Sequence, residues 1–409
     1  MILFFLTSGL FLGWSLGAND ASNVFGSAVG SKMVTFRKAA IIASIAVILG
    51  SVIQGAGTSD TLGKLGAVNA IGGSFTLALA AAVTVYTMTK FSLPVSTTQA
   101  IVGAIVGWNL FTGNQTDSGT LSKIMATWVS GPVLGAVFSV LLYMLIVKIK
   151  KESKIHLIRF ESYLRTGLIL VGAFGAYSLG ANNIANVMGV FVPAFNLGEL
   201  NLGLFTLSSN QQLFLLGSIA IALGIITYSR RVMETVGGNI MELSSEAALV
   251  VVLAQSLVLF IFSSSALSNL FVKTGLPPIP LVPVSSSQVI VGCVIGIGLY
   301  KGARNINFRL LGEIGIGWIA TPVISGLLAF FSLFFVKNIF NVNVGQKVTD
   351  RLMSESVVTA DPVISEIIKY LLLAVMVTGF IIALYYYLME RQKQKELRAS
   401  EEKFWHYLK

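Results

Sequence analysis

Charged residues, histidine and cysteine are all scarce in this sequence of 409 residues. Only 11% of the residues are charged and 55% are hydrophobic, with a mean hydropathy of +0.81, which excludes an ordinary soluble enzyme. The single cysteine, Cys293, excludes an internal disulfide, and both histidines, His156 and His406, fall outside the apolar runs. We therefore expect no redox centre, no histidine-ligated metal and no enzymatic reaction centre inside a membrane.

Alternating segments of about ten residues, which would indicate an outer-membrane barrel, are also missing. The sequence instead carries continuous apolar runs of about 20 residues, each long enough to cross a hydrocarbon core of roughly 30 Å as a helix. It therefore predicts an all-α multispan membrane protein. The expected apolar segments are 2–27, 37–56, 71–90, 94–111, 122–147, 163–192, 211–229, 246–271, 283–300, 310–336 and 365–389.

Basic residues are concentrated in a few connections between these runs. The net charge of +10 in a membrane protein reports cytoplasmic loops, so nucleic-acid binding need not be invoked. The linker 148–162 is rich in lysine, which predicts a cytoplasmic position, an outer N-terminus and a cytoplasmic C-terminus. The first run starts at Met1 without a basic region or a cleavage site, which predicts a retained helix in a plasma or bacterial inner membrane.

Two motifs occur twice. Trp14–Asn23 (WSLGANDASN) returns 163 residues later as Tyr177–Asn186 (YSLGANNIAN), with six identities in ten positions. Pro94–Gly103 (PVSTTQAIVG) returns as Pro283–Gly292 (PVSSSQVIVG). Weaker echoes pair Ser44–Gly50 with Ser218–Gly224, and Trp128 and Pro132 with Trp318 and Pro322.

The order of these motifs predicts a duplicated unit. The charge pattern starts the first copy outside and the second inside, which predicts two inverted-topology repeats, an arrangement typical of secondary transporters. We expect repeat 1 at 1–147 with a re-entrant helical hairpin at 71–111, the basic linker at 148–162, and repeat 2 at 163–336 with a paired hairpin at 246–300. An outer loop at 337–364 and a final span with its tail at 365–409 complete the expectation.

The first motif places Asp20 within an apolar run, where an ionised carboxylate costs at least a few kcal/mol unless it meets a cation or water. Gly17 and Gly26 permit an unwound or closely packed backbone, and the Asn amides offer an oxygen to a cation or an NH₂ group to an anion. The alternative is a polar contact at a helix seam. Duplication of the motif favours a site that binds a cation and an anion together.

The second motif has a proline followed by three hydroxyl residues and a glutamine, which predicts a helix N-terminus with the proline in its first turn. The free N–H groups and the positive dipole end make an anion site. Two such ends entering from opposite sides would converge on one tetrahedral oxyanion. The alternative is an interrupted helix whose hydroxyls satisfy freed carbonyls.

With these motifs the sequence resembles the inorganic phosphate transporter family, over nearly the whole chain. The resemblance implies a symporter, often dimeric, that imports inorganic phosphate with sodium ions by alternating access, without a cofactor. Its phosphate-binding residues would be Ser96, Thr97, Thr98, Gln99, Ser285, Ser286, Ser287, Gln288, Asn23 and Asn186. Its sodium ligands would be Asn19, Asp20, Asn23, Asn182, Asn183, Asn186, Thr97 and Ser286.

The sequence departs from many members of that family in two respects. It has Asn183 where many carry a second aspartate, and Gln99 and Gln288 where many carry a histidine. The missing histidines remove the best candidate for a proton relay and favour sodium, although Asp20 could carry a proton. A proton-coupled carrier of phosphate or metal-phosphate therefore stays open as an alternative, as does an anion channel.

Overall fold

The structure is a computed structural model. It describes residues 2–66, 68–90, 95–152, 156–201, 206–230, 233, 244–303, 307–345, 358–359, 370 and 392. The chain divides into two compact units, residues 1–359 and 360–409, and the first of them contains the helices that carry the duplicated motifs. The expected final span at 365–389 and its tail lie outside the described residues, apart from two single positions.

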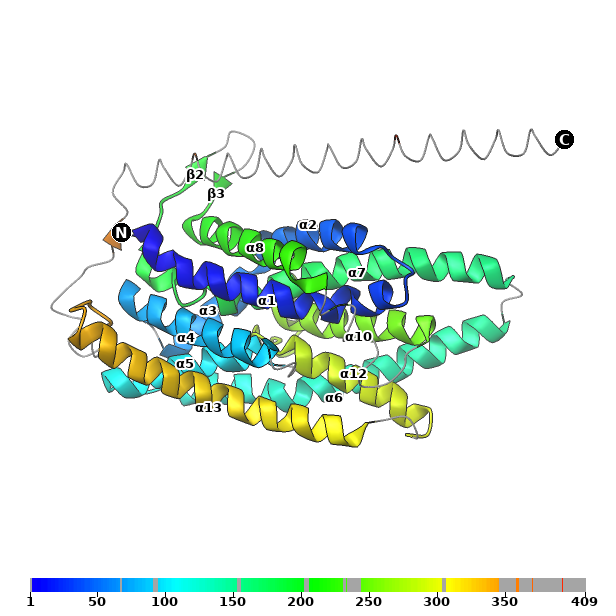
Figure 1. Cartoon of the computed structure of the whole chain (residues 1–409). Helices are drawn as coiled ribbons and strands as arrows, with labels where there is room; N and C mark the ends of the chain where they lie inside the picture. The colour runs from blue at the N-terminus through cyan, green and yellow to red at the C-terminus, as the bar shows by residue number, and fades with distance from the viewer. Residues whose placement is uncertain are drawn as a thin grey trace. The chain divides into compact units, whose positions relative to one another are not determined.

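Helices make up nearly all of the described fold, and they lie side by side within the first unit (Figure 1). The N-terminal half contains α1 (Ile2–Gly30), α2 (Phe36–Gln54), α3 (Ala56–Gly66), α4 (Ile71–Lys90), α5 (Thr97–Thr112) and α6 (Ser118–Glu152). The C-terminal half contains α7 (Leu157–Met188), α8 (Ser209–Thr227), α10 (Ser245–Ser263), α11 (Ser265–Lys273), α12 (Ser286–Tyr300) and α13 (Phe308–Asn338).

Short extended segments lie in the connection between α7 and α8. The 3-10 turn Val192–Ala194 leads into β1 (Phe195–Asn196), which pairs in parallel with β4 (Val358–Thr359). β2 (Leu200–Asn201) pairs antiparallel with β3 (Thr206–Leu207). The expected outer loop at 337–364 therefore contributes one strand to a pair with the α7–α8 connection.

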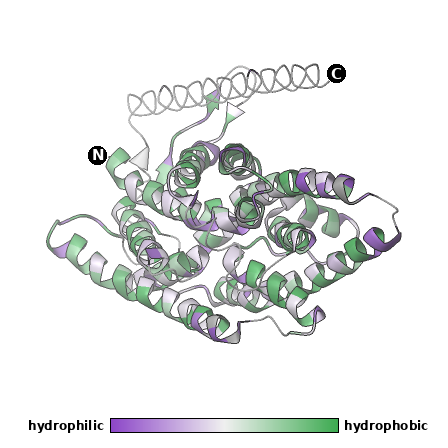
Figure 2. Cartoon of the chain, turned by 45° about the vertical axis from the view of Figure 1, so that its right-hand side comes forward, coloured by the Kyte–Doolittle hydropathy of each residue, from purple (hydrophilic) through white to green (hydrophobic). Residues whose placement is uncertain are grey.

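Seven of the described helices are long and apolar enough to cross a membrane: 36–54, 71–90, 118–152, 159–188, 209–227, 245–263 and 311–338. This confirms the prediction of an all-α multispan membrane protein. Hydrophobic residues run along the helices, with hydrophilic ones at several helix ends and connections (Figure 2). The outward sides of α6 and α13 carry highly exposed apolar side chains, such as Val129 at 69% and Ile319 at 74% exposure, as expected for a surface that faces lipid or another apolar partner.

The structure adds to or differs from the expected segments in three places. The apolar segment 246–271 is not one span, because α10 ends at Ser263 and Ser264 caps a new helix by accepting a hydrogen bond from the Leu267 N–H. The linker 148–162 is mostly helical, since α6 continues to Glu152 and α7 begins at Leu157. The apolar runs also failed to predict a helix at 56–66, where α3 follows α2 after Gly55.

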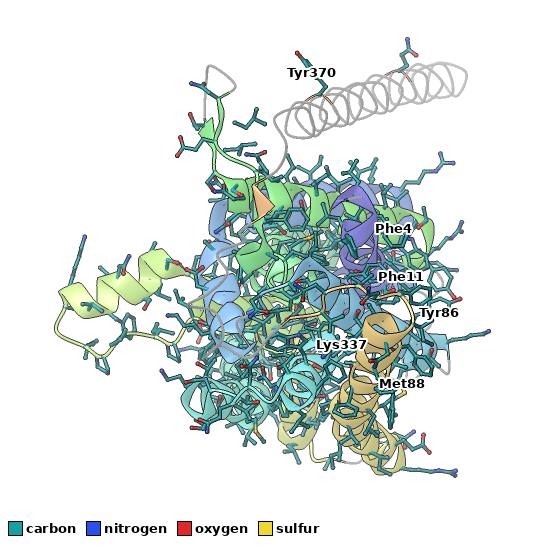
Figure 3. All side chains as sticks on the ribbon, turned by 90° about the vertical axis from the view of Figure 1, so that its left-hand side faces the viewer. Phe4, Phe11, Tyr86, Met88, Lys337 and Tyr370 are labelled. Carbon is teal, nitrogen blue, oxygen red and sulfur yellow. The ribbon has the colours of Figure 1, made fainter. Side chains whose placement is uncertain are left out.

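Aromatic residues hold α1 against α4. Phe11 and Tyr86 lie near each other (Figure 3), with ring centroids 6.1 Å apart. The ring centroids of Trp14 and Tyr86 lie 6.3 Å apart. The Trp14 indole N–H also donates to Thr227 Oγ1 at the end of α8 over 3.0 Å. Such rings add packing area and a directional contact to the apolar burial of the helices.

Close helix contacts recur at corresponding positions of the two halves. A Cβ on Gly17 of α1 would collide with the Ile221 carbonyl of α8, and a Cβ on the matching Gly180 of α7 would collide with the Val47 carbonyl of α2. Val47 and Ile221 are themselves partners in the echo between Ser44–Gly50 and Ser218–Gly224. Each motif helix therefore packs on the second helix of the other half, at a distance that only glycine permits.

The hydroxyl-motif helices cross the long proline-containing helices in the same reciprocal way. Gly103 of α5 lies against the backbone of Pro322 in α13, and Gly292 of α12 lies against that of Pro132 in α6. Each contact would be blocked by a Cβ. These four residues were paired by the sequence echoes, so the duplication in sequence is also a duplication of packing.

Candidate functional site

The two hydroxyl motifs form the capped N-termini of α5 and α12. Ser96 caps α5 by accepting a hydrogen bond from the Gln99 N–H over 3.2 Å, and Ser285 caps α12 by accepting from the Gln288 N–H over 3.3 Å. The prediction that a proline occupies the first turn was wrong for α12, because Pro283 precedes the cap residue in an extended segment and Ser286 is the first helical residue. Pro94 lies outside the described residues.

These two N-termini touch each other. The Ser287 hydroxyl donates to the Val95 carbonyl oxygen, just before α5, over 3.0 Å, and its oxygen lies 3.2 Å from Ser285 Oγ. Residues nearly 200 positions apart in sequence are thus hydrogen-bonded. The N–H groups of a first helical turn have no partner within the helix, so two sets of free donors meet in one place.

The first asparagine motif supplies the carboxylate of the site. Asp20 lies within α1, which continues without interruption from Ile2 to Gly30, so the backbone is closely packed rather than unwound there. Asp20 Oδ1 accepts a hydrogen bond from the Asn19 amide over 2.8 Å. Its Oδ2 accepts from the Ser286 hydroxyl, in the first turn of α12, over 2.6 Å.

The second asparagine motif, in the continuous helix α7, binds both N-termini. The Asn186 amide donates to Thr98 Oγ1 of α5 and to Asn183 Oδ1, each over 2.9 Å. Asn182 Oδ1 accepts from the Val284 N–H over 3.0 Å, and its amide donates to the Val282 carbonyl over 3.4 Å. The two valines flank Pro283, so Asn182 fixes the extended segment that enters α12.

The structure therefore brings the four motifs together on α1, α5, α7 and α12. All the predicted site residues are buried, at 9% exposure or less: Asn19, Asp20, Asn23, Ser96, Thr97, Thr98, Gln99, Asn182, Asn183, Asn186, Ser285, Ser286, Ser287 and Gln288. Several of their buried polar atoms have no hydrogen-bond partner among the described residues: Asn23 Nδ2, Thr97 Oγ1, Gln99 Oε1, Asn183 Nδ2, Asn186 Oδ1 and Gln288 Oε1.

Unpaired polar atoms in a buried place are costly, and several in one cluster point to a ligand or to water. The cluster offers N–H and hydroxyl donors to an oxyanion, and carboxylate, amide and hydroxyl oxygens to a hard cation. In the part of the chain that the structure describes, no group of three or more histidine, cysteine or acidic side chains gathers to hold a metal ion. A cation here would be held by one carboxylate and neutral oxygens.

A model described as the phosphate transporter family matches residues 16–329 and 282–408 of the chain. The chain belongs to the phosphate transporter family. This is a family of transporters and not of enzymes, so the chain transports phosphate across a membrane.

Individual members of the phosphate transporter family are similar over most of their length. A "Putative phosphate permease" of Thermococcus kodakarensis is 25% identical over 405 residues, covering 81% of this chain and 96% of the relative. One of Methanocaldococcus jannaschii is 27% identical over 326 residues, covering 80% and 94%. A solved structure, "The sodium-dependent phosphate transporter", superposes with a TM-score of 0.65 and 24% identity, covering 83% of this chain and 99% of that one.

Sequence reasoning missed the backbone groups of this site. The Val95 carbonyl and the Val284 N–H each bond a motif side chain, yet valine carries no chemical signal that would mark them. Only their position between a proline and the cap residues Ser96 and Ser285 could have pointed to them.

Proposed function

We propose that this member of the phosphate transporter family imports inorganic phosphate together with sodium ions, as a symporter that works by alternating access. The observation that carries the proposal is the buried Asp20 carboxylate, which accepts a hydrogen bond from Ser286 at an N-terminus suited to an anion. A sodium ion on Asp20 would offset the charge of a phosphate bound by the adjacent donors. The name of the structurally similar transporter, which is sodium-dependent, supports the choice of cation.

The assignment of ligands follows from the chemistry of each group. Phosphate would accept from the free first-turn N–H groups and from the hydroxyl and amide donors of Ser96, Thr97, Thr98, Ser285, Ser286, Ser287, Gln99, Gln288, Asn23 and Asn186. Sodium would bind the oxygens of Asp20 and the neighbouring Asn19, Asn23, Asn182, Asn183, Asn186, Thr97 and Ser286.

We further propose that the two halves are inverted repeats whose hairpins, 71–111 and 246–300, gate opposite faces. The reciprocal contacts of Gly17 with Ile221 and of Gly180 with Val47 support a two-fold relation between the halves. Basic residues lie at the ends of α6 and α12. Lys150 of α6 forms an ion pair with Glu246 at the start of α10 over 2.6 Å, and Lys301 after α12 lies over the Tyr143 ring of α6 at 4.9 Å. This basic end favours a cytoplasmic position for the α6–α7 connection and an outer N-terminus. A homodimer is a further part of the proposal.

Uptake of labelled phosphate into proteoliposomes tests the coupling. Wild type, Asp20→Asn and the control Glu313→Gln, which removes a half-exposed carboxylate paired with Arg309, are compared under a sodium gradient, a proton gradient or neither. We expect sodium-driven accumulation by wild type and Glu313→Gln, and a loss of at least about 100-fold in Asp20→Asn. Accumulation driven by a proton gradient alone would show that the coupling ion is the proton and not sodium. Phosphate flux that needs neither gradient would indicate a channel.

A further inference from the structure

Gln255 is a buried amide that none of the duplicated motifs includes. It lies near the middle of α10, is 1% exposed, and neither its Nε2 nor its Oε1 atom has a hydrogen-bond partner in the described part of the chain. Because α10 is apolar and long enough to span a membrane, burying such a group destabilises the protein unless something binds it. An unpaired amide inside a span is a candidate for a ligand-binding group.

The packing of α10 shows which way Gln255 faces. Leu249, Leu253, Leu257 and Phe260 are partly exposed and form one side of the helix, and the Phe260 ring lies 5.5 Å from Phe174 of α7. Successive residues turn by about 100° around a helix, so Gln255 lies on the opposite, buried side.

Helix α1 is one of the neighbours of α10. Ser256 and Val252 lie beside Gly175 of α7, where Val24 of α1 also approaches. Val24, which directly follows the Asn19–Asn23 motif, lies beside the same glycine as Ser256, the residue next to Gln255.

The height of Gln255 along α10 also matches the N-terminus of α12, which packs on α10. The Val282 N–H donates to the Phe262 carbonyl over 3.2 Å, so these residues are neighbours. Gln255 precedes Phe262 by two helical turns, about 10 Å, and Ser285 follows Val282 by three extended residues, again about 10 Å. Gln255 thus lies level with the segment in which Ser286 bonds Asp20.

The first half of the chain has no amide at the corresponding position. The shift that pairs Ser44 with Ser218 also pairs Ala81 with Gln255, and it superimposes the partly exposed positions of α4 on those of α10. Ala81 is fully buried, as is Gln255. The amide is therefore present on α10, which packs on α12, α7 and α1, and absent from α4, which packs on α5 and α1.

We propose that Gln255 Oε1 is a further ligand of the sodium ion held by Asp20, so that α10 joins α1 and the N-terminus of α12 in the cation site. The inference rests on the proposed sodium coupling. It explains why an amide with two unpaired polar atoms is present in a span.

The test measures the sodium concentration for half-maximal phosphate uptake into proteoliposomes for wild type, Gln255→Met, Gln255→Glu and Ser256→Ala. Gln255→Met keeps the volume but removes the oxygen, and should raise the half-saturating sodium concentration about tenfold, with the phosphate KM at saturating sodium unchanged. Gln255→Glu keeps an oxygen and should not raise it. Ser256→Ala is the matched control, because its hydroxyl bonds the Val252 carbonyl of its own helix and the corresponding residue is Ala82.

The stability of the same variants in detergent gives a readout independent of transport. Sodium without phosphate should raise the Tm of wild type and of Ser256→Ala, and raise it less for Gln255→Met. Equal sodium dependence of wild type and Gln255→Met overturns the inference, as does a rise in Gln255→Glu as large as in Gln255→Met, which would mark a purely structural role. If wild-type uptake shows no sodium dependence, the proposed function fails and this inference with it.

Discussion

The two halves of the site share their backbone arrangement and differ in their chemistry. In one, the Asp20 carboxylate accepts a hydrogen bond from Ser286 of α12. In the other, the corresponding Asn183 has its oxygen bonded to Asn186, and the corresponding Thr97 hydroxyl has no partner among the residues that the structure describes. The half with Asp20 can therefore neutralise the charge of a cation. The half with Asn183 offers only neutral oxygens and hydrogen-bond donors.

This difference shows that a duplicated scaffold can keep the same packing in both halves while the two halves bind different groups. The close glycine contacts are equal in both halves because they are needed to bring four helices together, whatever the ligand. The polar residues are unequal because a cation and an oxyanion need different partners. Substitutions of the polar residues should therefore affect the two halves unequally, and substitutions of the packing glycines should affect them alike.

Moving the carboxylate across the site tests whether the halves are interchangeable. Asp20→Asn combined with Asn183→Asp keeps the total charge, but places the carboxylate in the half that has Ala81 instead of Gln255. We expect sodium-driven uptake to stay at least about 100-fold below wild type, because the transferred carboxylate lacks its full set of oxygens. Recovery of uptake in labelled-phosphate assays would show that the two halves are equivalent.

The helix crossings should respond equally in both halves. Gly103→Ala and Gly292→Ala would each press a Cβ into a proline-bearing backbone and should destabilise the protein by about 1–3 kcal/mol. Gly312→Ala is the control, because a Cβ there meets open space within α13 and alanine favours helix. The Tm of each variant in detergent measures the effect, and a fall confined to one of the two crossings would contradict the equivalence of the packing.

The hydroxyls that begin α5 and α12 should respond unequally. Ser286→Ala removes a hydrogen bond from the Asp20 carboxylate and should weaken sodium binding about three- to tenfold. Thr97→Val removes a proposed sodium ligand from the half that has no carboxylate, and should raise the half-saturating sodium concentration by no more than about twofold. Sodium titrations of phosphate uptake distinguish the two, and equal effects would place a second cation beside Asn183.

Much of the fold could be predicted because membrane spans depend on local composition. Continuous apolar runs predicted the bounds of α2, α4 and α8 to within a few residues. The predicted break points were less accurate: α10 ends at Ser263 within an apolar run, because Ser264 caps a new helix and the run itself gives no signal there. Pro283 likewise precedes α12, because Asn182 holds the segment beside it in an extended conformation.

The sequence by itself determined the membrane class, the duplicated motifs and the residues of the candidate site, since hydropathy, charge and repeated motifs are properties of the order of amino acids. The tertiary structure alone decided which motif meets which. Ser286 bonds Asp20 and Asn186 bonds Thr98, so each hydroxyl motif pairs with the asparagine motif of the other half. It also decided that Gln255 is buried without a hydrogen-bond partner among the described residues. Such pairings arise from helices packed at distances set by Gly17, Gly103, Gly180 and Gly292, and contacts between segments so far apart in the chain leave no local pattern to read.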